Sequence, residues 1–240
     1  MKKLLFLFMI SLNIWALSSS EILKKVDYNT IPTTVKYDGK MVIHQGSSVL
    51  TKEMKVTAKG ADLGLIEFMS PARDKGTKFL RTDSLLYIYF PSAGKTQKLS
   101  GHMLRQGMMG SDLSYEDQTS RNKLDDIYNS KILKETDNEY TLELILKPNE
   151  ENSYYKRVLT VDKKKFVLLD SLMYANSGKL LKELSVLKYE KIKDRYYITH
   201  FKMEDKIKKD SYTEIISSNI QVDLDVPDST FNLNNLEKKN

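Results

Sequence analysis

Three carboxylates lie close together in this chain and are its best candidates for acid–base chemistry. Asp112, Glu116 and Asp117 fall within residues 107–117, Gly-Met-Met-Gly-Ser-Asp-Leu-Ser-Tyr-Glu-Asp. Paired carboxylates can serve as general acid and general base. No nucleophile, base or metal ligand accompanies them in sequence. Ser114 and Asp117 instead have the spacing of a capping box, so we expect these acids to stabilise the start of a short helix.

Other catalytic chemistries find little support in the residue types. The three histidines, His44, His102 and His200, are scattered and have no metal-ligand spacing. The chain has no cysteine, which excludes thiolate chemistry. It also has no Gly-x-Ser-x-Gly elbow and no glycine-rich phosphate loop. The sequence therefore predicts a protein that is not an enzyme, with no catalytic residues, no metal and no cofactor.

The same run is rich in methionine and glycine. Met108 and Met109 are adjacent, and Met103 precedes them. Methionine is flexible and polarizable, so these side chains could repack against acyl chains of varied shape, or they could fill a gap in the core. Gly107 and Gly110 permit backbone conformations that a β-carbon forbids. Both interpretations of the methionines stay open, and Ser111 is a further candidate helix cap.

The N-terminus has the features of a secretory signal peptide. Lys2 and Lys3 precede an apolar run from Leu4 to Leu17, and Ala16 and Ser18 form a small-residue cleavage site. The run has about 14 residues, whereas a membrane-spanning helix needs about 20, which disfavours an N-terminal anchor. We expect residues 1–18 to be removed by a cut after Ser18. Without cysteine there is no acylated anchor, so the mature protein is predicted to be exported, without disulfides.

Charge and length indicate one globular domain, residues 19–240. The net charge is +6, and it falls to +4 without the two signal lysines, because 36 basic residues then face 32 acidic ones. Basic and acidic residues interleave along the chain, and this mixed charge argues against nucleic-acid binding. The clusters 163–165 and 206–209 fit solvated turns, and only weakly a patch for anionic lipid head groups.

The hydrophobic pattern predicts mostly β-structure after one short helix. Ser20 is expected to cap an amphipathic helix over 21–26, which Pro32 ends. Short strand-like runs then follow, separated by turn residues and without alternating helices, which favours an antiparallel sheet. The expected strands are 35–44, 48–59, 63–69, 77–81, 85–90, 96–99, 130–135, 140–147, 154–161, 166–174, 180–189, 196–203 and 212–221.

Several of these strands are apolar on both faces. In 85–90, Leu85, Tyr87 and Tyr89 alternate with Leu86 and other apolar side chains, and 166–173 shows the same feature. A sheet with one wet face does not need this pattern. A strongly curved sheet covered by helices or closed around a ligand does need it, and so does an ordinary sandwich core.

Five motifs, in order along the chain, resemble the outer membrane lipoprotein-sorting protein family, within the LolA/LolB-like group of periplasmic carriers. They are Phe68-Met-Ser-Pro-Ala-Arg-Asp-Lys-Gly-Thr77, Tyr87-Ile-Tyr-Phe-Pro-Ser92, the Met-Gly-Ser-Asp block 108–117, Lys179-Leu-Leu-Lys182 and Asp228-Ser-Thr-Phe-Asn232. One departure is Tyr87, where relatives often carry tryptophan. An aromatic side chain is kept, so its packing role survives.

The resemblance implies a mainly β fold with a few helices, a strongly curved antiparallel half-barrel with a helical lid over an apolar cavity. It also implies a monomeric periplasmic carrier of a lipid or of lipoprotein acyl chains, with an inner-membrane export complex and an outer-membrane acceptor as partners. The cavity and lid are expected to contain Leu65, Phe68, Tyr87, Tyr89, Met103, Met108, Met109, Leu113 and Tyr115. Two other classes stay open: an envelope scaffold or sensor that binds protein, and a lipid hydrolase with a dyad facing the cavity.

Overall fold

The protein is described by a computed structural model over residues 17–82, 85–119 and 123–238. Within these residues thirteen strands form one antiparallel sheet. All the expected strands are confirmed, with ends shifted by at most three residues. The strands are β1 (Thr34–Gln45), β2 (Ser48–Lys59), β3 (Leu63–Ser70), β4 (Lys78–Thr82), β5 (Leu85–Phe90), β6 (Lys95–Leu99), β7 (Tyr128–Glu135), β8 (Glu139–Leu146), β9 (Lys156–Asp162), β10 (Leu168–Tyr174), β11 (Leu180–Ile192), β12 (Arg195–Asp205) and β13 (Ser211–Val222).

The chain builds the sheet from its centre and then from its far edge. Strands β1 to β6 run outward in order on one side, and β7 starts again at the opposite edge. Strands β8 to β13 return to the middle, where β13 pairs with β1 and Tyr212 lies opposite His44. The segment between β6 and β7 therefore has to cross the molecule from one edge of the sheet to the other.

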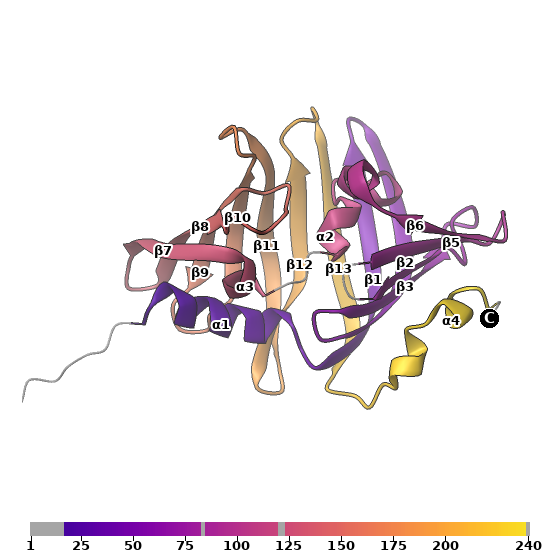
Figure 1. Ribbon diagram of the computed structural model, residues 1–240, viewed down its shortest axis with the longest axis horizontal. Helices are drawn as coiled ribbons and strands as arrows, with labels where there is room; N and C mark the ends of the chain where they lie inside the picture. The colour runs from indigo at the N-terminus through magenta and orange to yellow at the C-terminus, as the bar shows by residue number, and fades with distance from the viewer. Residues whose placement is uncertain (1–16, 83–84, 120–122, 239–240) are drawn as a thin grey trace, which may run out of the picture.

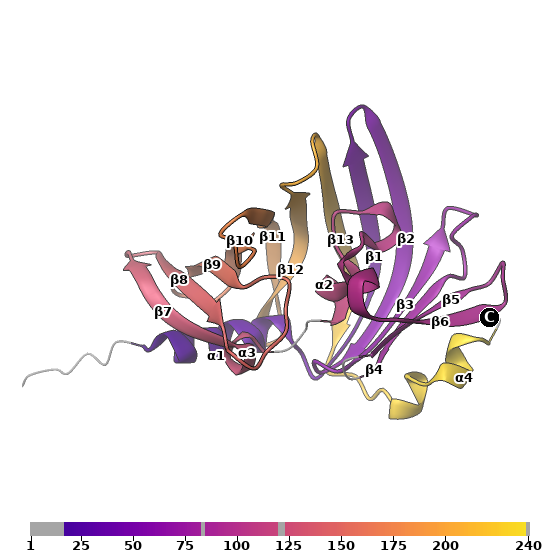
Figure 2. The ribbon, with the colours of Figure 1, turned by 45° about the horizontal axis from the view of Figure 1, so that its top comes forward.

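The sheet is strongly curved, and its concave side holds the N-terminal helix and the helices between β6 and β7 (Figure 1). The connecting segment, residues 100–127, contains the short helices η1 (Gly101–Arg105), η2 (Met108–Gly110), α2 (Tyr115–Thr119) and α3 (Leu124–Ile127). Figure 2 shows this segment inside the trough between the two halves of the sheet. A single curved sheet covered by helices confirms the half-barrel and excludes the two-sheet sandwich.

Helix α1 (Ser19–Thr30) covers the concave side of the β7–β12 half (Figure 1). Ile22, Leu23 and Val26 are buried, because their spacing places them on one helix face. The predicted cap is wrong, since Ser18 accepts from the Glu21 amide at 3.3 Å while Glu21 Oε2 accepts from the Ser18 amide at 2.8 Å. The hydroxyl of Ser20 donates to Asp125 instead. The predicted signal peptide lies outside the described residues, except for Leu17 and Ser18.

The C-terminal end of α1 is fixed to two hairpin turns by one buried amide. The side-chain amide of Asn29 donates to the carbonyls of Lys165 and Phe166 at 2.8 and 2.9 Å. Its oxygen accepts from the Tyr196 amide at 2.9 Å. Arg195 adds a 2.7 Å hydrogen bond to the Tyr28 carbonyl. These contacts hold the C-terminal end of α1 over the ends of β9–β12.

Two apolar clusters fill the concave side, one in each half. The first joins β1–β6 to the connecting segment through Met41, Phe68, Phe79 and Met108, and it extends to Met203 on β12. The second joins α1 to β7–β9 through Ile22, Leu23, Leu142, Leu144 and Leu159. The first cluster thus reaches the central strands of the trough, whereas the second lies under α1.

A third cluster lies on the opposite face of β3–β5. There the C-terminal segment, with η3 (Asp228–Thr230) and α4 (Leu233–Leu236), packs Val226, Phe231 and Leu236 against Leu80 and Tyr89. Figure 2 shows this segment outside the trough. The apolar character of both faces of β5 follows, because one face meets the connecting segment and the other meets the C-terminal segment. In the residues described, no helix is long and apolar enough to cross a membrane.

Candidate ligand cavity

A cavity of about 250 Å³ lies between α1 and the concave face of the central strands. Helix α1 contributes Val26, Asp27 and Thr30, Ile31 follows it, and α3 contributes Leu124 and Ile127. Leu113 and Asp117 of the connecting segment form part of the wall. The strands supply Tyr37, Arg157, Leu168, Met173, Leu184, Tyr197, Ile198, Phe201, Met203, Ile215 and Ser217, and Asn152 and Tyr154 precede β9.

The alternation of the strands explains this lining. Tyr197, Phe201 and Met203 on β12 and Ile215 on β13 point to the same side of the sheet, because side chains two residues apart share a face. Most of the wall is aliphatic, aromatic or thioether, which suits a hydrocarbon chain. Asp27 and Arg157 are its charged members on α1 and β9.

Asp27 joins the wall of the cavity to the start of α3. Its carboxylate accepts from the Leu124 amide at 3.0 Å, at a helix start where no side chain of Lys123 provides a cap. Burial raises the pKa of Asp27 to about 6, although hydrogen bonds from the amides of Leu124 and Asp125 oppose the shift. The cost of burying the charged form is therefore only partly compensated.

We expect the Asp27→Asn variant to be the more stable protein at neutral pH. A carboxyl with a folded pKa near 6 and an unfolded pKa of 3.8 binds its proton more tightly in the folded state. Stability then rises as pH falls from about 6 to 4, and Asp27 costs up to about 3 kcal/mol above that window. Asparagine keeps an acceptor for the Leu124 amide without a charge.

The measurement is urea unfolding of both proteins between pH 4 and pH 8. The difference in unfolding free energy should grow in favour of the variant as pH rises through this window and level off near pH 7. Asp225→Asn, at an exposed position, serves as the control and should show no such growth. A constant difference between wild type and Asp27→Asn would contradict the assignment.

Asp112 fixes the connecting segment to the hairpin between β12 and β13. Its carboxylate accepts from Ser211 at 2.7 Å, Thr213 at 2.8 Å and Lys208 at 3.1 Å. Its amide donates to the hydroxyl of Thr213 at 3.0 Å. Asp112 is only 1% exposed, so these bonds replace water almost completely. The carboxylate is an anchor that is fully occupied by structural contacts.

Asp117 and Glu116 form a second anchor, next to the cavity. Asp117 and Ser114 make the predicted capping box, with the Ser114 amide 2.7 Å from Asp117 Oδ2. Asp117 also accepts from Lys182 and from the Tyr154 hydroxyl, each at 2.7 Å. Glu116 accepts from the amide and hydroxyl of Ser153. The expected capping role is confirmed for Asp117, whereas the partner of Glu116 is Ser153 in the segment before β9. Asp117 also links the connecting segment to β11 through Lys182.

Residues 60–238 match the model of a protein family whose description is "Uncharacterized protein". The chain belongs to this family. It shares 27% identity with a DUF1329 family protein from Desulfovibrio piger, over 90% of this chain and 97% of the other, with a TM-score of 0.83. No curated protein sequence matches it.

Two further solved structures identify the fold of this family member. One, described as an outer membrane lipoprotein-sorting protein domain from Vibrio parahaemolyticus, has a TM-score of 0.81 at 22% identity over 91% of this chain and 98% of that one. The other, a LolA superfamily protein from Nitrosomonas europaea, has a TM-score of 0.77 at 23% identity over 92% and 100%. The LolA-like fold implied by the sequence motifs is confirmed.

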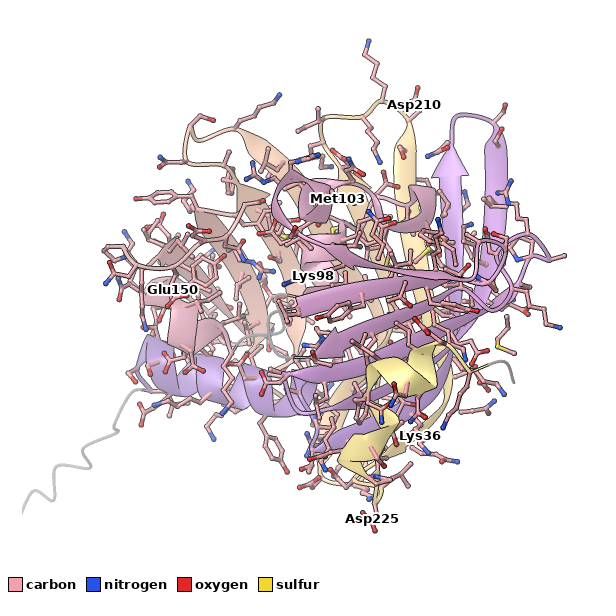
Figure 3. All side chains as sticks on the ribbon, turned by 45° about the vertical axis from the view of Figure 1, so that its right-hand side comes forward. Lys36, Lys98, Met103, Glu150, Asp210 and Asp225 are labelled. Carbon is pink, nitrogen blue, oxygen red and sulfur yellow. The ribbon has the colours of Figure 1, made fainter. Side chains whose placement is uncertain are left out.

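In this LolA-like fold, the expected cavity residues fall into three places. Leu113 lines the cavity under α1. Phe68 and Met108 are buried in the cluster beneath the connecting segment, and Met103, Met109 and Tyr115 pack against that cluster. Figure 3 shows Met103 on the connecting segment, over the concave side of the sheet. The structure therefore places Met108 as a core filler, and Met109 beside a separate pocket of about 200 Å³.

Leu65, Tyr87 and Tyr89 do not lie on the concave side at all. They pack on the opposite face of β3 and β5 with the C-terminal segment. Their neighbours Ile66, Leu86 and Ile88 face the connecting segment. The prediction that Leu65, Tyr87 and Tyr89 line the cavity is therefore corrected. It chose the wrong face of β3 and β5, because a shift of one residue along a strand moves a side chain to the other face.

The glycines of the connecting segment serve the loop geometry. Gly110 has a φ of +83°, in the region that favours glycine. A β-carbon on Gly107 would lie 2.5 Å from the Ser111 carbonyl, so close packing requires glycine there. Ser111 does not cap a helix as expected. Its hydroxyl donates to the carbonyl of Met108 at 2.7 Å and contacts that of Leu113, which closes the η2 turn.

The histidines fall in different surroundings. His44 and His200 both face Glu214 on the central strands, with His200 Nε2 at 2.6 Å and His44 Nε2 at 3.6 Å from its oxygens. His102 lies in η1. Within the described ranges, no group of three His, Cys, Asp or Glu residues is arranged to hold a metal ion.

Proposed function

We propose that this protein is a periplasmic carrier that binds a lipid or lipoprotein acyl chains in the cavity under α1 and moves them between the inner and outer membranes. The observation that carries the proposal is the cavity itself, about 250 Å³ with a mostly apolar wall, in a LolA-like fold. Apolar pockets with few polar groups are the usual form of small-molecule sites. In this proposal the carrier binds and releases its ligand and catalyses no reaction.

Energetics favour a cavity that can open. Burying an acyl chain is worth about 0.8 kcal/mol per CH₂ relative to water. A bilayer offers nearly the same gain, so loading and release are close to balanced. Helix α1 suits such an opening because polar contacts of Asn29 and Arg195 fix its C-terminal end. Polar contacts can be exchanged for water at low net cost.

The predicted signal peptide supplies the route to the periplasm. An inner-membrane export complex would load the carrier, and an outer-membrane acceptor would receive its cargo. The carrier is proposed to work as a monomer.

Native mass spectrometry and lipid extraction of protein purified from the periplasm test this function. Co-purified lipid or acylated peptide would support the carrier. Protein that is consistently empty and takes up no fluorescent fatty acid would refute it and favour an envelope scaffold instead. N-terminal sequencing of the same material tests the predicted start at Ser19.

A further inference from the structure

We propose that the cavity takes a single acyl chain ending in a carboxylate, with the Arg157 guanidinium as the carboxylate's binding partner. This inference depends on the proposed function, because it names the class of ligand for the same cavity. It rests on the volume of the cavity and on the Arg157 Nε in its wall, a donor that has no hydrogen-bond partner.

The volume limits the number of chains. A cavity of 150 Å³ is large enough for benzene. The 250 Å³ here lies below the usual 300–1,000 Å³ of pockets for drug-sized ligands. The packed clusters around Met108 and around Leu144 border this cavity, and the pocket beside Met109 has its own, separate lining. The space therefore suits one chain, and several chains would need α1 to move away.

Arg157 is a cation in this wall whose bonding is incomplete. Its Nη2 donates to the Ser171 hydroxyl at 3.3 Å, while its Nε is buried without a hydrogen-bond partner. The guanidinium also lies close enough to the Tyr128 hydroxyl to lower its pKa, against a larger rise caused by burial. No carboxylate among the residues described forms an ion pair with Arg157.

The two carboxylates of the cavity wall are committed elsewhere. Asp117 is held by Lys182, Tyr154 and the amide of Ser114. Asp27 lies on α1 and accepts from Leu124 at the start of α3. Neither carboxylate forms an ion pair with Arg157, although Asp117 and Arg157 are both close enough to Tyr154 to shift its pKa, in opposite directions.

A ligand carboxylate would meet this need. Guanidinium and carboxylate match in a planar, two-bond geometry, and such charge-assisted bonds are stronger than neutral ones. Arg157 is half-buried, so water weakens such a pair less than it would at the surface. An apolar chain lying along β10–β13 with its head group at β9 would satisfy the aliphatic wall and Arg157 together. A fatty acid has this chemistry, whereas a fatty alcohol has the chain without the charge.

The test compares binding of dodecanoate and dodecanol at pH 8 by displacement of a fluorescent probe. Wild type should bind dodecanoate more tightly, and Arg157→Gln should weaken dodecanoate at least 10-fold while changing dodecanol less than threefold. Arg157→Lys keeps the charge but loses the planar, two-bond geometry of the guanidinium, so its affinity for dodecanoate should lie between those of wild type and Arg157→Gln. Lys156→Gln is the matched control, because Lys156 lies next to Arg157 on β9 and is placed over the Tyr174 ring.

Three results would overturn the inference. Equal affinity of wild type for both ligands would remove the head-group selectivity. An unchanged dodecanoate affinity in Arg157→Gln would remove the role of Arg157, and a parallel loss for both ligands would reduce that role to shaping the cavity. Wild type that binds neither ligand would instead count against the carrier function itself, so the two failures are distinguishable. Thermal unfolding of each variant identifies any that is not folded.

Discussion

Replacing Met108 with aspartate is expected to destabilise the protein by about 4 kcal/mol or more, enough to unfold much of it at 37 °C. Met108 is 1% exposed and belongs to the cluster of Met41, Phe68 and Phe79. An aspartate there would be a buried charge without a partner, one of the few changes that cost this much. Urea unfolding followed by circular dichroism measures the loss.

Met109 provides the matched control one residue away. It lies at the margin of the same cluster, beside the pocket formed with Ile43, Leu50 and Arg73. Its Asp variant should lose no more than about 1.5 kcal/mol, because the new charge can reach water. A Met108 variant as stable as the Met109 variant would show that the connecting segment does not pack on the sheet as described.

Removing the Asp112 carboxylate is expected to cost about 3 kcal/mol and to loosen the connecting segment. Asp112→Ala would leave Ser211, Thr213 and Lys208 without their common acceptor, and Thr213 is fully buried. Hydrogen bonds to a charged group contribute about 1.5–3 kcal/mol, and unsatisfied partners add to the loss. Hydrogen exchange of residues 107–117 should accelerate more than exchange in β7–β9.

Asp225→Ala is the comparison for this variant. Asp225 is exposed in the C-terminal segment, at the lower end of the molecule in Figure 3. Its removal should change stability by less than about 0.5 kcal/mol. If Asp112→Ala were as stable as Asp225→Ala, the Met-Gly-Ser-Asp motif would lose its role as the anchor of the connecting segment.

Much of the fold could be predicted from short-range pattern. The ends of strands 48–59 and 85–90 are predicted to the residue, because turn residues such as Lys59-Gly60 and Pro91-Ser92 mark where each strand-like run stops. The capping box at Ser114 and Asp117 was predicted for the same reason, since three residues suffice to define it. The N-terminal cap was misplaced by two residues, because consecutive serines at 18–20 all have the cap chemistry.

The cavity could not be predicted in this way. Its walls bring Val26 and Asp27 of α1 together with Phe201 and Ile215, which are nearly 200 positions apart. That juxtaposition follows from the pairing of β1 with β13, a long-range contact that local periodicity does not encode. A signal did exist in the alternation of β12, where Tyr197, Phe201 and Met203 share one face.

Tyr87 and Tyr89 show why the face of a strand was the weakest prediction. Both faces of β5 are apolar, so sequence pattern gives no preference for one side. The C-terminal segment decides the matter, since Phe231 and Leu236 cover the face opposite to the trough. The methionine-rich run indicates the fold family and contains the residues that anchor the connecting segment to the sheet. The cavity lies beside this run and not beneath it.

The central claim is that an acyl chain lies between α1 and strands β10–β13. Photo-crosslinking with a diazirine-bearing fatty acid, followed by mass spectrometric mapping of the labelled residues, tests it most directly. We predict saturable labelling of α1 and of β11–β13, centred on Leu184, Met203 and Ile215 and competed by unlabelled fatty acid. Labelling confined to residues 101–110 or to the face of Leu65 and Tyr87, or labelling that does not saturate, would contradict the account.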